Sequence, residues 1–171
     1  MKALVVYESM WGNTEKVARA VAHGLENSME TTDVAVLDVA KEVPQELGGV
    51  GLLVVGGPTH AFSMSRPSTR SDAVTKGAPT GHEARGIREW LDGLPESHLA
   101  VATFDTRVGK VKHLPGSAAK KAAKLVRRHH LGRVVDSESF YVDDLAGPLL
   151  DGELERAQAW GSGLVGSAVV A

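Results

Sequence analysis

The chain has 171 residues, of which 43% are hydrophobic and 23% charged, and its formal net charge is −2. This is an ordinary globular composition, and the length predicts a single domain, residues 1–171, with its own core. Because cysteine is absent, disulfides, thiolate metal sites and thiol catalysis are excluded, which fits a cytoplasmic protein. No apolar stretch approaches the ~20 residues of a membrane span, so none is expected.

The predicted elements alternate between apolar, β-branched strands and amphipathic helices. The strands are expected at residues 3–7, 33–39, 51–57, 98–104 and 133–142. The helices are expected at residues 13–28, 82–94, 116–131 and 151–168, the last weakened near its end by Gly161, Gly163 and Gly166. The crossover between residues 39 and 51 is the least helical, since it contains Pro44 and Gly48-Gly49.

This alternation predicts an α/β fold in which right-handed crossovers join parallel strands and helices cover both faces of the sheet. The strands are continuously apolar rather than alternating, which agrees with a sheet buried on both sides. We therefore expect a three-layer sandwich around a five-stranded parallel sheet.

The junction after the first strand reads Ser-Met-Trp-Gly-Asn-Thr at residues 9–14. Asn13-Thr14 open a helix whose first N–H groups are unpaired and lie at the positive end of its dipole, so the turn predicts a phosphate site. The hydroxyls of Ser9 and Thr14 and the amide of Asn13 are further candidate donors. An ordinary capped turn is the simpler alternative.

The segment from residue 58 to 81 is rich in Pro, Ser, Thr, Gly and Arg and has little periodicity, which predicts a long loop. Loops above ~12–15 residues are uncommon and are usually functional or disordered. In a sheet of order 2-1-3-4-5, ligands bind where the order reverses, between strands one and three. This loop and residues 9–14 are therefore expected to be neighbours.

Three segments together resemble the flavin loops of the flavodoxin family. Residues 9–14 are similar to its FMN phosphate loop, residues 56–62 to its second flavin loop, and residues 103–107 with Gly109 take the place of the third. The resemblance implies a flavodoxin-like fold of strand order 2-1-3-4-5 with FMN as cofactor. The cofactor-binding residues that it implies are Ser9, Met10, Trp11, Gly12, Asn13, Thr14, Pro58, Thr59, His60, Ala61, Phe62, Thr103, Phe104, Asp105, Thr106, Arg107 and Gly109.

The resemblance also implies a role for each loop. The first would wrap the FMN phosphate, Pro58 and Thr59 would follow the ribityl chain, and residues 60–62 would line the isoalloxazine. Residues 105–107 would approach its pyrimidine end. The simpler interpretations are that His60 is an exposed loop residue, Phe62 a core residue and Asp105 a turn residue.

Three features depart from the family pattern. The second and third loops offer only His60, Phe62 and Phe104 to sandwich a flavin, while Trp11 stands in the first loop. The chain is nearly neutral, with cations expected near the cofactor that would raise its potential: Arg66, Arg70, Arg107, Lys110 and Lys112. No long insertion splits the last strand, which favours the short-chain form.

Charge is unevenly distributed along the chain. Nine Lys or Arg residues and no acid lie between Arg107 and Arg133, whereas residues 136–155 hold seven acids and no Lys or Arg. A solvated helix face is the simpler interpretation of the basic stretch. The alternatives are a dock for an acidic redox partner or for the phosphates of NAD(P)H. Nucleic acid binding has no supporting motif, and the scattered histidines predict no metal site.

Three functional hypotheses follow. The first is an FMN-binding electron-transfer protein, and the second is an FMN-dependent oxidoreductase that passes electrons from NAD(P)H to a quinone. The third is a flavin-free relative that binds another anion. A dinucleotide fold is excluded because the first turn lacks Gly-x-Gly-x-x-Gly, and a receiver domain because strand three ends in Gly56-Gly57 rather than an acid.

Overall fold

The computed structural model describes residues 1–28 and 33–169. Its elements, in chain order, are β1 (Lys2–Tyr7), α1 (Asn13–Ser28), β2 (Asp33–Asp38), β3 (Val50–His60), β4 (Ser63–Met64), α2 (Pro67–Thr75), α3 (Ile87–Asp92), β5 (Leu99–Val108), the 3-10 turn η1 (Gly109–Val111), α4 (Ala118–Arg128), β6 (Gly132–Val142) and α5 (Glu153–Val169).

The sheet has the predicted topology. Five parallel strands follow the order β2-β1-β3-β5-β6, and the two-residue strand β4 adds an antiparallel pairing at the end of β3. The predicted order 2-1-3-4-5 is therefore confirmed, with β4 as an extra short strand. The last strand runs unbroken from Gly132 to Val142.

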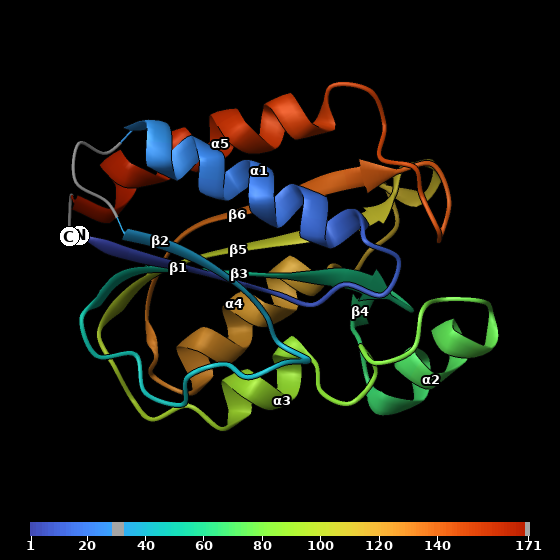
Figure 1. Ribbon diagram of the computed structural model, residues 1–171, viewed down its shortest axis with the longest axis horizontal. Coiled ribbons are helices and arrows are strands. Elements are labelled where there is room, and N and C mark those ends of the chain that lie inside the picture. The colour runs from blue at the N-terminus through green and yellow to red at the C-terminus, as the bar shows by residue number, and fades with distance from the viewer. Residues whose placement is uncertain (29–32, 170–171) are drawn as a thin grey trace.

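The sheet separates two apolar cores. Helices α1 and α5 cover one face, and α3 and α4 cover the other (Figure 1). Leu25, Phe140 and Leu164 belong to the first core, whereas Trp90 and Val126 belong to the second. The three-layer sandwich is confirmed. Among the described residues, no helix has both the length and the hydropathy to cross a bilayer.

The segment predicted as a long loop contains regular structure instead. Strand β3 extends to His60, a two-residue turn leads into β4, and α2 follows beside the carboxyl ends of the strands (Figure 1). The sequence pattern missed α2 because only Arg70 and Ala73 of its nine residues are buried, so no apolar stripe marks it.

Two other boundaries differ from the prediction. The helix expected at residues 82–94 is reduced to α3, because His82 and Arg85 bond to Asp38 and the Val39 carbonyl instead of entering the helix. Residues 103–107 were expected to leave the fourth strand as a loop, yet they continue β5, which pairs with β6 as far as Val108.

Candidate functional site

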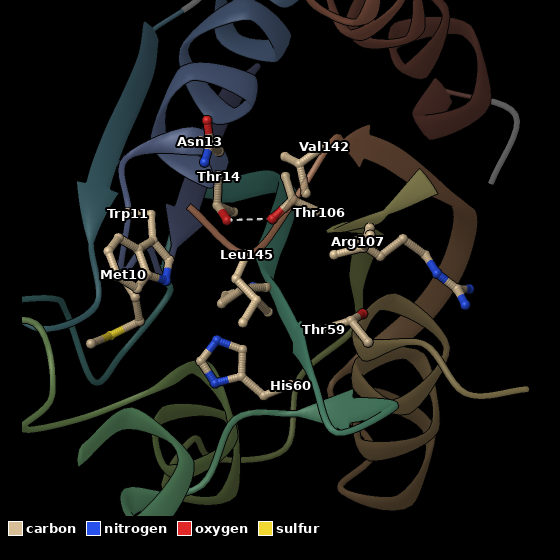
Figure 2. Close-up of a pocket in the computed structure, with 12 residues that line it drawn as sticks. Met10, Trp11, Asn13, Thr14, Thr59, His60, Thr106, Arg107, Val142 and Leu145 are labelled. Carbon is tan, nitrogen blue, oxygen red and sulfur yellow. Dashed lines mark hydrogen bonds between the residues drawn. The ribbon is translucent and has the colours of Figure 1, made fainter. Parts of the chain in front are cut away.

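A cleft lies at the carboxyl ends of β1, β3 and β5, where the strand order reverses. Its hollow has an empty volume of about 400 Å³, which includes space open to solvent. Figure 2 shows its lining from the first loop, the end of β3 and the end of β5. The lining residues are Met10, Trp11, Asn13, Thr14, Pro58, Thr59, His60, Thr106, Arg107, Val108, Val142 and Leu145.

The first loop is held in shape by two of its expected phosphate donors. The Ser9 hydroxyl accepts a hydrogen bond from the Gly12 N–H at 3.0 Å, and the Asn13 amide donates to the Ala146 carbonyl at 3.1 Å. Gly12 has a φ of +87°, a conformation that favours glycine. These two side chains therefore build the turn, while Ser9 and Gly12 do not line the hollow themselves.

The start of α1 presents backbone donors to the cleft. The Lys16 N–H bonds back to the Gly12 carbonyl at 3.2 Å. The N–H groups of Asn13, Thr14 and Glu15 precede this first turn, so the helix has no carbonyl to offer them. The Thr14 hydroxyl shares a hydrogen bond with that of Thr106, with the two oxygens 2.7 Å apart (Figure 2). No carboxylate lines the hollow, so its chemistry suits an anion.

The second loop contributes Pro58, Thr59 and His60 to the lining. The Thr59 hydroxyl donates to the Asp105 carboxylate and accepts from the Ala118 N–H, both at 2.9 Å, which fixes the end of β3 to the start of α4. Phe62 is 52% exposed and lines neither this hollow nor its neighbour, so it is not the core residue of the simpler interpretation.

Only Thr106 and Arg107 of the third stretch line the cleft. Phe104 is 1% exposed and packs edge-on against Phe140 and Trp160. The Asp105 carboxylate lies beneath α4, where it accepts hydrogen bonds from the Ser117 hydroxyl and the Ala119 N–H.

Thr103 and Gly109 also lie outside the lining. Thr103 donates its hydroxyl hydrogen to Ser137, and Gly109 belongs to η1. The structure therefore does not bring the whole third stretch to the cleft. The reason is that most of it is strand, in which successive side chains point to opposite faces.

Two of the five cations expected near the cofactor are paired with acids. Arg70 has no exposed surface and pairs with Glu89 at 3.2 Å. The Arg107 guanidinium donates to the carbonyls of Val111 and Leu114 and points away from the centre of the cleft (Figure 2). Lys110 pairs with Asp143 at 3.0 Å.

A buried carboxyl directly precedes the first loop. Glu8 accepts hydrogen bonds from the Ser65 hydroxyl and from the Ile87 N–H, the latter at 3.0 Å. Burial raises the pKa of Glu8, and its two hydrogen bonds and the nearby Arg70 oppose that rise. Glu8 and Ser65 thus join β1 to the segment that carries α2.

A second hollow of about 570 Å³ adjoins the cleft and shares Trp11, Thr59, His60 and Leu145 with it. Its other lining residues are Ala61, the α2 residues Thr69, Asp72 and Ala73, and Lys76 directly after that helix. Burial lowers the pKa of His60, and the Arg70 charge lowers it further, so the imidazole is neutral at pH 7.

The lining contains residues that the sequence did not single out. Val108, Val142 and Leu145 come from strand ends and a loop that carry no recognisable motif. One sequence observation points indirectly to the α2 residues as part of the site: the segment of residues 58–81 is expected beside the first loop. That expectation is confirmed, since Ala73 packs against Met10 and Trp11.

The flavodoxin family model matches residues 5–68, which hold the first two loops. A flavodoxin from the domain Archaea is 21% identical, with a TM-score of 0.64 over 99% of both chains. The chain has a flavodoxin-like fold. Flavodoxin 1 from Bacillus cereus is 16% identical, with a TM-score of 0.63 over 97% of this chain and 98% of that one. A short-chain flavodoxin associated with a non-canonical PDU bacterial microcompartment is 15% identical, with a TM-score of 0.64 over 98% of this flavodoxin-like chain and 99% of its own.

The cleft of this flavodoxin-like protein fits a phosphorylated flavin. Backbone N–H groups at the start of α1 suit a phosphate, and the lining offers it no repelling carboxylate. Trp11, His60 and Leu145 supply flat or apolar surface between the two hollows.

Proposed function

We propose that this flavodoxin-like chain binds FMN in the cleft and works as an electron-transfer protein. The free N–H groups at the start of α1 carry this proposal, because Asn13 and Thr14 line a cleft to which the described residues contribute no carboxylate. FMN, when bound, supplies the chemistry of accepting and passing on electrons. A redox protein or NAD(P)H is the proposed source of those electrons.

The chain's own residues divide the work of holding the cofactor. The loop of residues 9–14 binds the phosphate, with Ser9 and Asn13 keeping the loop in shape. Pro58 and Thr59 follow the ribityl chain, and Asp105 acts indirectly by anchoring the Thr59 hydroxyl. The region between Trp11, His60 and Leu145 accepts the ring system, which a neutral His60 contacts without adding charge.

Titration with FMN and with riboflavin, which lacks the phosphate, tests the proposal. We expect the chain to quench FMN fluorescence and to bind riboflavin at least about a hundredfold more weakly, because charge-assisted hydrogen bonds to the phosphate are lost. Thr14→Val should weaken FMN binding by about tenfold, since a hydroxyl leaves the phosphate loop.

Thr75→Val is the matched control, because Thr75 is exposed at the end of α2. It should bind FMN as the natural chain does. Equal affinity for FMN and riboflavin would exclude the phosphate loop, and unchanged FMN fluorescence at saturating protein would leave the flavin-free hypothesis in its place.

The second hollow favours one further candidate function, an FMN-dependent oxidoreductase. Its position beside Trp11 and under α2 leaves room for a second small molecule, such as a quinone, next to the flavin. Steady-state oxidation of NAD(P)H by the FMN-loaded chain, with and without quinone, distinguishes the two. A carrier gives no quinone-dependent turnover, whereas an oxidoreductase does.

A further inference from the structure

Exposed apolar side chains gather at the edge of the sheet that holds the cleft. Seven large hydrophobic side chains are exposed within residues 1–28 and 33–168, and five of them lie on the connections after β3, β5 and β6. Those five are Phe62, Val111, Leu114, Leu145 and Leu150. Exposed apolar side chains grouped in this way mark an interaction site more often than scattered ones do.

Phe62 is presented to solvent by a strained turn. Ala61 and Phe62 connect β3 to β4 with φ values of 46° and 62°, in the left-handed region that disfavours a bulky side chain. A Cβ on Gly116 would lie 2.1 Å from the Phe62 carbonyl oxygen, so the turn before α4 packs directly against this tip. Strain of this kind is concentrated at functional sites.

Leu114 lies two residues before Gly116, and its N–H bonds to the Val111 carbonyl at 3.0 Å, so both residues belong to the connection that meets Phe62. Arg107 holds both residues in place, because its guanidinium donates to their carbonyl oxygens at 3.4 and 3.0 Å. Their side chains are 37% and 46% exposed. The three apolar residues thus form the centre of a fixed surface rather than the tip of a loose loop.

Lysines lie on the same connection and in the helix that follows it. Lys112, Lys120 and Lys121 are exposed, and the first turn of α4 contains no acid. The helix dipole disfavours cations in a first turn, so Lys120 and Lys121 do not serve the helix. The negative charge that the start of α4 favours comes from the buried Asp105 carboxylate, which accepts hydrogen bonds from the Ser117 hydroxyl and the Ala119 N–H.

We propose that Phe62, Val111 and Leu114, together with Lys112, Lys120 and Lys121, form a docking face for an acidic redox protein. An apolar centre with a charged rim is the usual anatomy of a protein interface, and the lysines steer an acidic partner toward it. The face adjoins the cleft, because the Ala118 N–H bonds to the Thr59 hydroxyl. The choice of a redox protein rests on the proposed function, whereas docking itself does not require FMN.

The test uses a purified acidic [2Fe–2S] ferredoxin as the probe and the full ¹⁵N-labelled chain, with and without FMN. We expect saturable binding at low salt, with backbone NMR shifts concentrated at residue 62 and residues 111–121. Affinity should fall steeply as salt is added, because exposed charges are screened. The double variant Lys120→Glu/Lys121→Glu should weaken binding by more than about tenfold, and Phe62→Ser should also weaken it.

The double variant Lys2→Glu/Lys41→Glu is the matched control, since both lysines are exposed outside residue 62 and residues 111–121 and the change in net charge is the same. It should bind the probe nearly as well as the natural chain. An equal loss in both double variants, shifts centred on another face, or no saturable binding overturns the docking face. Lys112→Glu, outside any α-helix, repeats the test if the helix variant does not fold.

The two proposals fail in different ways. A chain that binds FMN but not the probe keeps the proposed function and loses the docking face. A chain that binds the probe through this face but not FMN keeps the docking face, and the proposed function is then wrong.

Discussion

Arg70 carries a permanent charge although none of its surface is exposed. Its guanidinium donates to the Ser65 hydroxyl at 2.9 Å and to the Glu83 carbonyl at 3.0 Å, and it pairs with Glu89. Ser65 in turn donates to Glu8, the residue before the phosphate loop. One side chain therefore links α2, α3 and the end of β1 behind the cleft.

Replacing Arg70 with methionine should destabilise the fold by about 3–5 kcal/mol, because the buried Glu8 and the half-buried Glu89 lose their cation. Urea unfolding at pH 7 measures the loss. The loss of stability should shrink as the pH is lowered. Burial already raises the pKa of Glu8, and removing Arg70 raises it further, so the folded variant binds a proton at Glu8 more tightly than the unfolded chain does.

Arg66→Met is the control, since Arg66 is exposed. It should change the free energy of unfolding by less than ~0.5 kcal/mol. Similar small changes in both variants, or a deficit that grows at lower pH, would contradict this account of Arg70.

At the scale of elements, α1 and α5 approach each other through glycine. A Cβ on Gly24 would lie 2.0 Å from the Gln158 carbonyl oxygen, and one on Gly161 would lie 2.2 Å from that of Val21. The sequence pattern treats Gly161, Gly163 and Gly166 alike, as residues that weaken the helix. The structure separates them, because only Gly161 packs against α1 while Gly163 and Gly166 have open space.

Two glycine substitutions in α5 should therefore have opposite effects. Gly161→Ala should destabilise the chain by about 1–3 kcal/mol, since the helices must move apart. Gly163→Ala should stabilise it by about 0.5–1 kcal/mol, because alanine favours the helix and meets nothing within 4 Å. Thermal or urea unfolding checks both, and a loss of stability in Gly163→Ala or a gain in Gly161→Ala would refute the packing argument.

Helix α2 and the carboxyl end of β5 are the parts of the fold that the sequence pattern does not predict. Helix α2 buries Arg70 and Ala73 but no apolar stripe, so its place comes from Ser65, Glu89 and the contact with Trp11 rather than from its own pattern. Strand β5 continues past Phe104 because β6 pairs with it there. Both outcomes depend on partners distant in the sequence.

At the scale of the whole molecule, FMN binding should raise the free energy of unfolding and the Tm. If FMN binds the folded chain alone, a concentration one hundred times Kd adds about 2.7 kcal/mol, or roughly 5–10 °C in Tm for a chain of this size. Riboflavin at the same concentration should add much less, because the phosphate loop then lacks its ligand. Equal shifts with both ligands, or no shift with FMN, would contradict a phosphate-anchored site.

The sequence by itself determined the strand and helix alternation, and its resemblance to the flavodoxin loops implied the strand order. The alternation follows from local periodicity and from topological rules that hold for parallel sheets. Only the tertiary structure decided which atoms face the cleft. Asp105 turns to α4, Arg107 points its charge away, and α2 completes a second hollow beside Trp11. The reason is physical: a side chain's direction depends on where a strand ends and on which distant groups can pair with it.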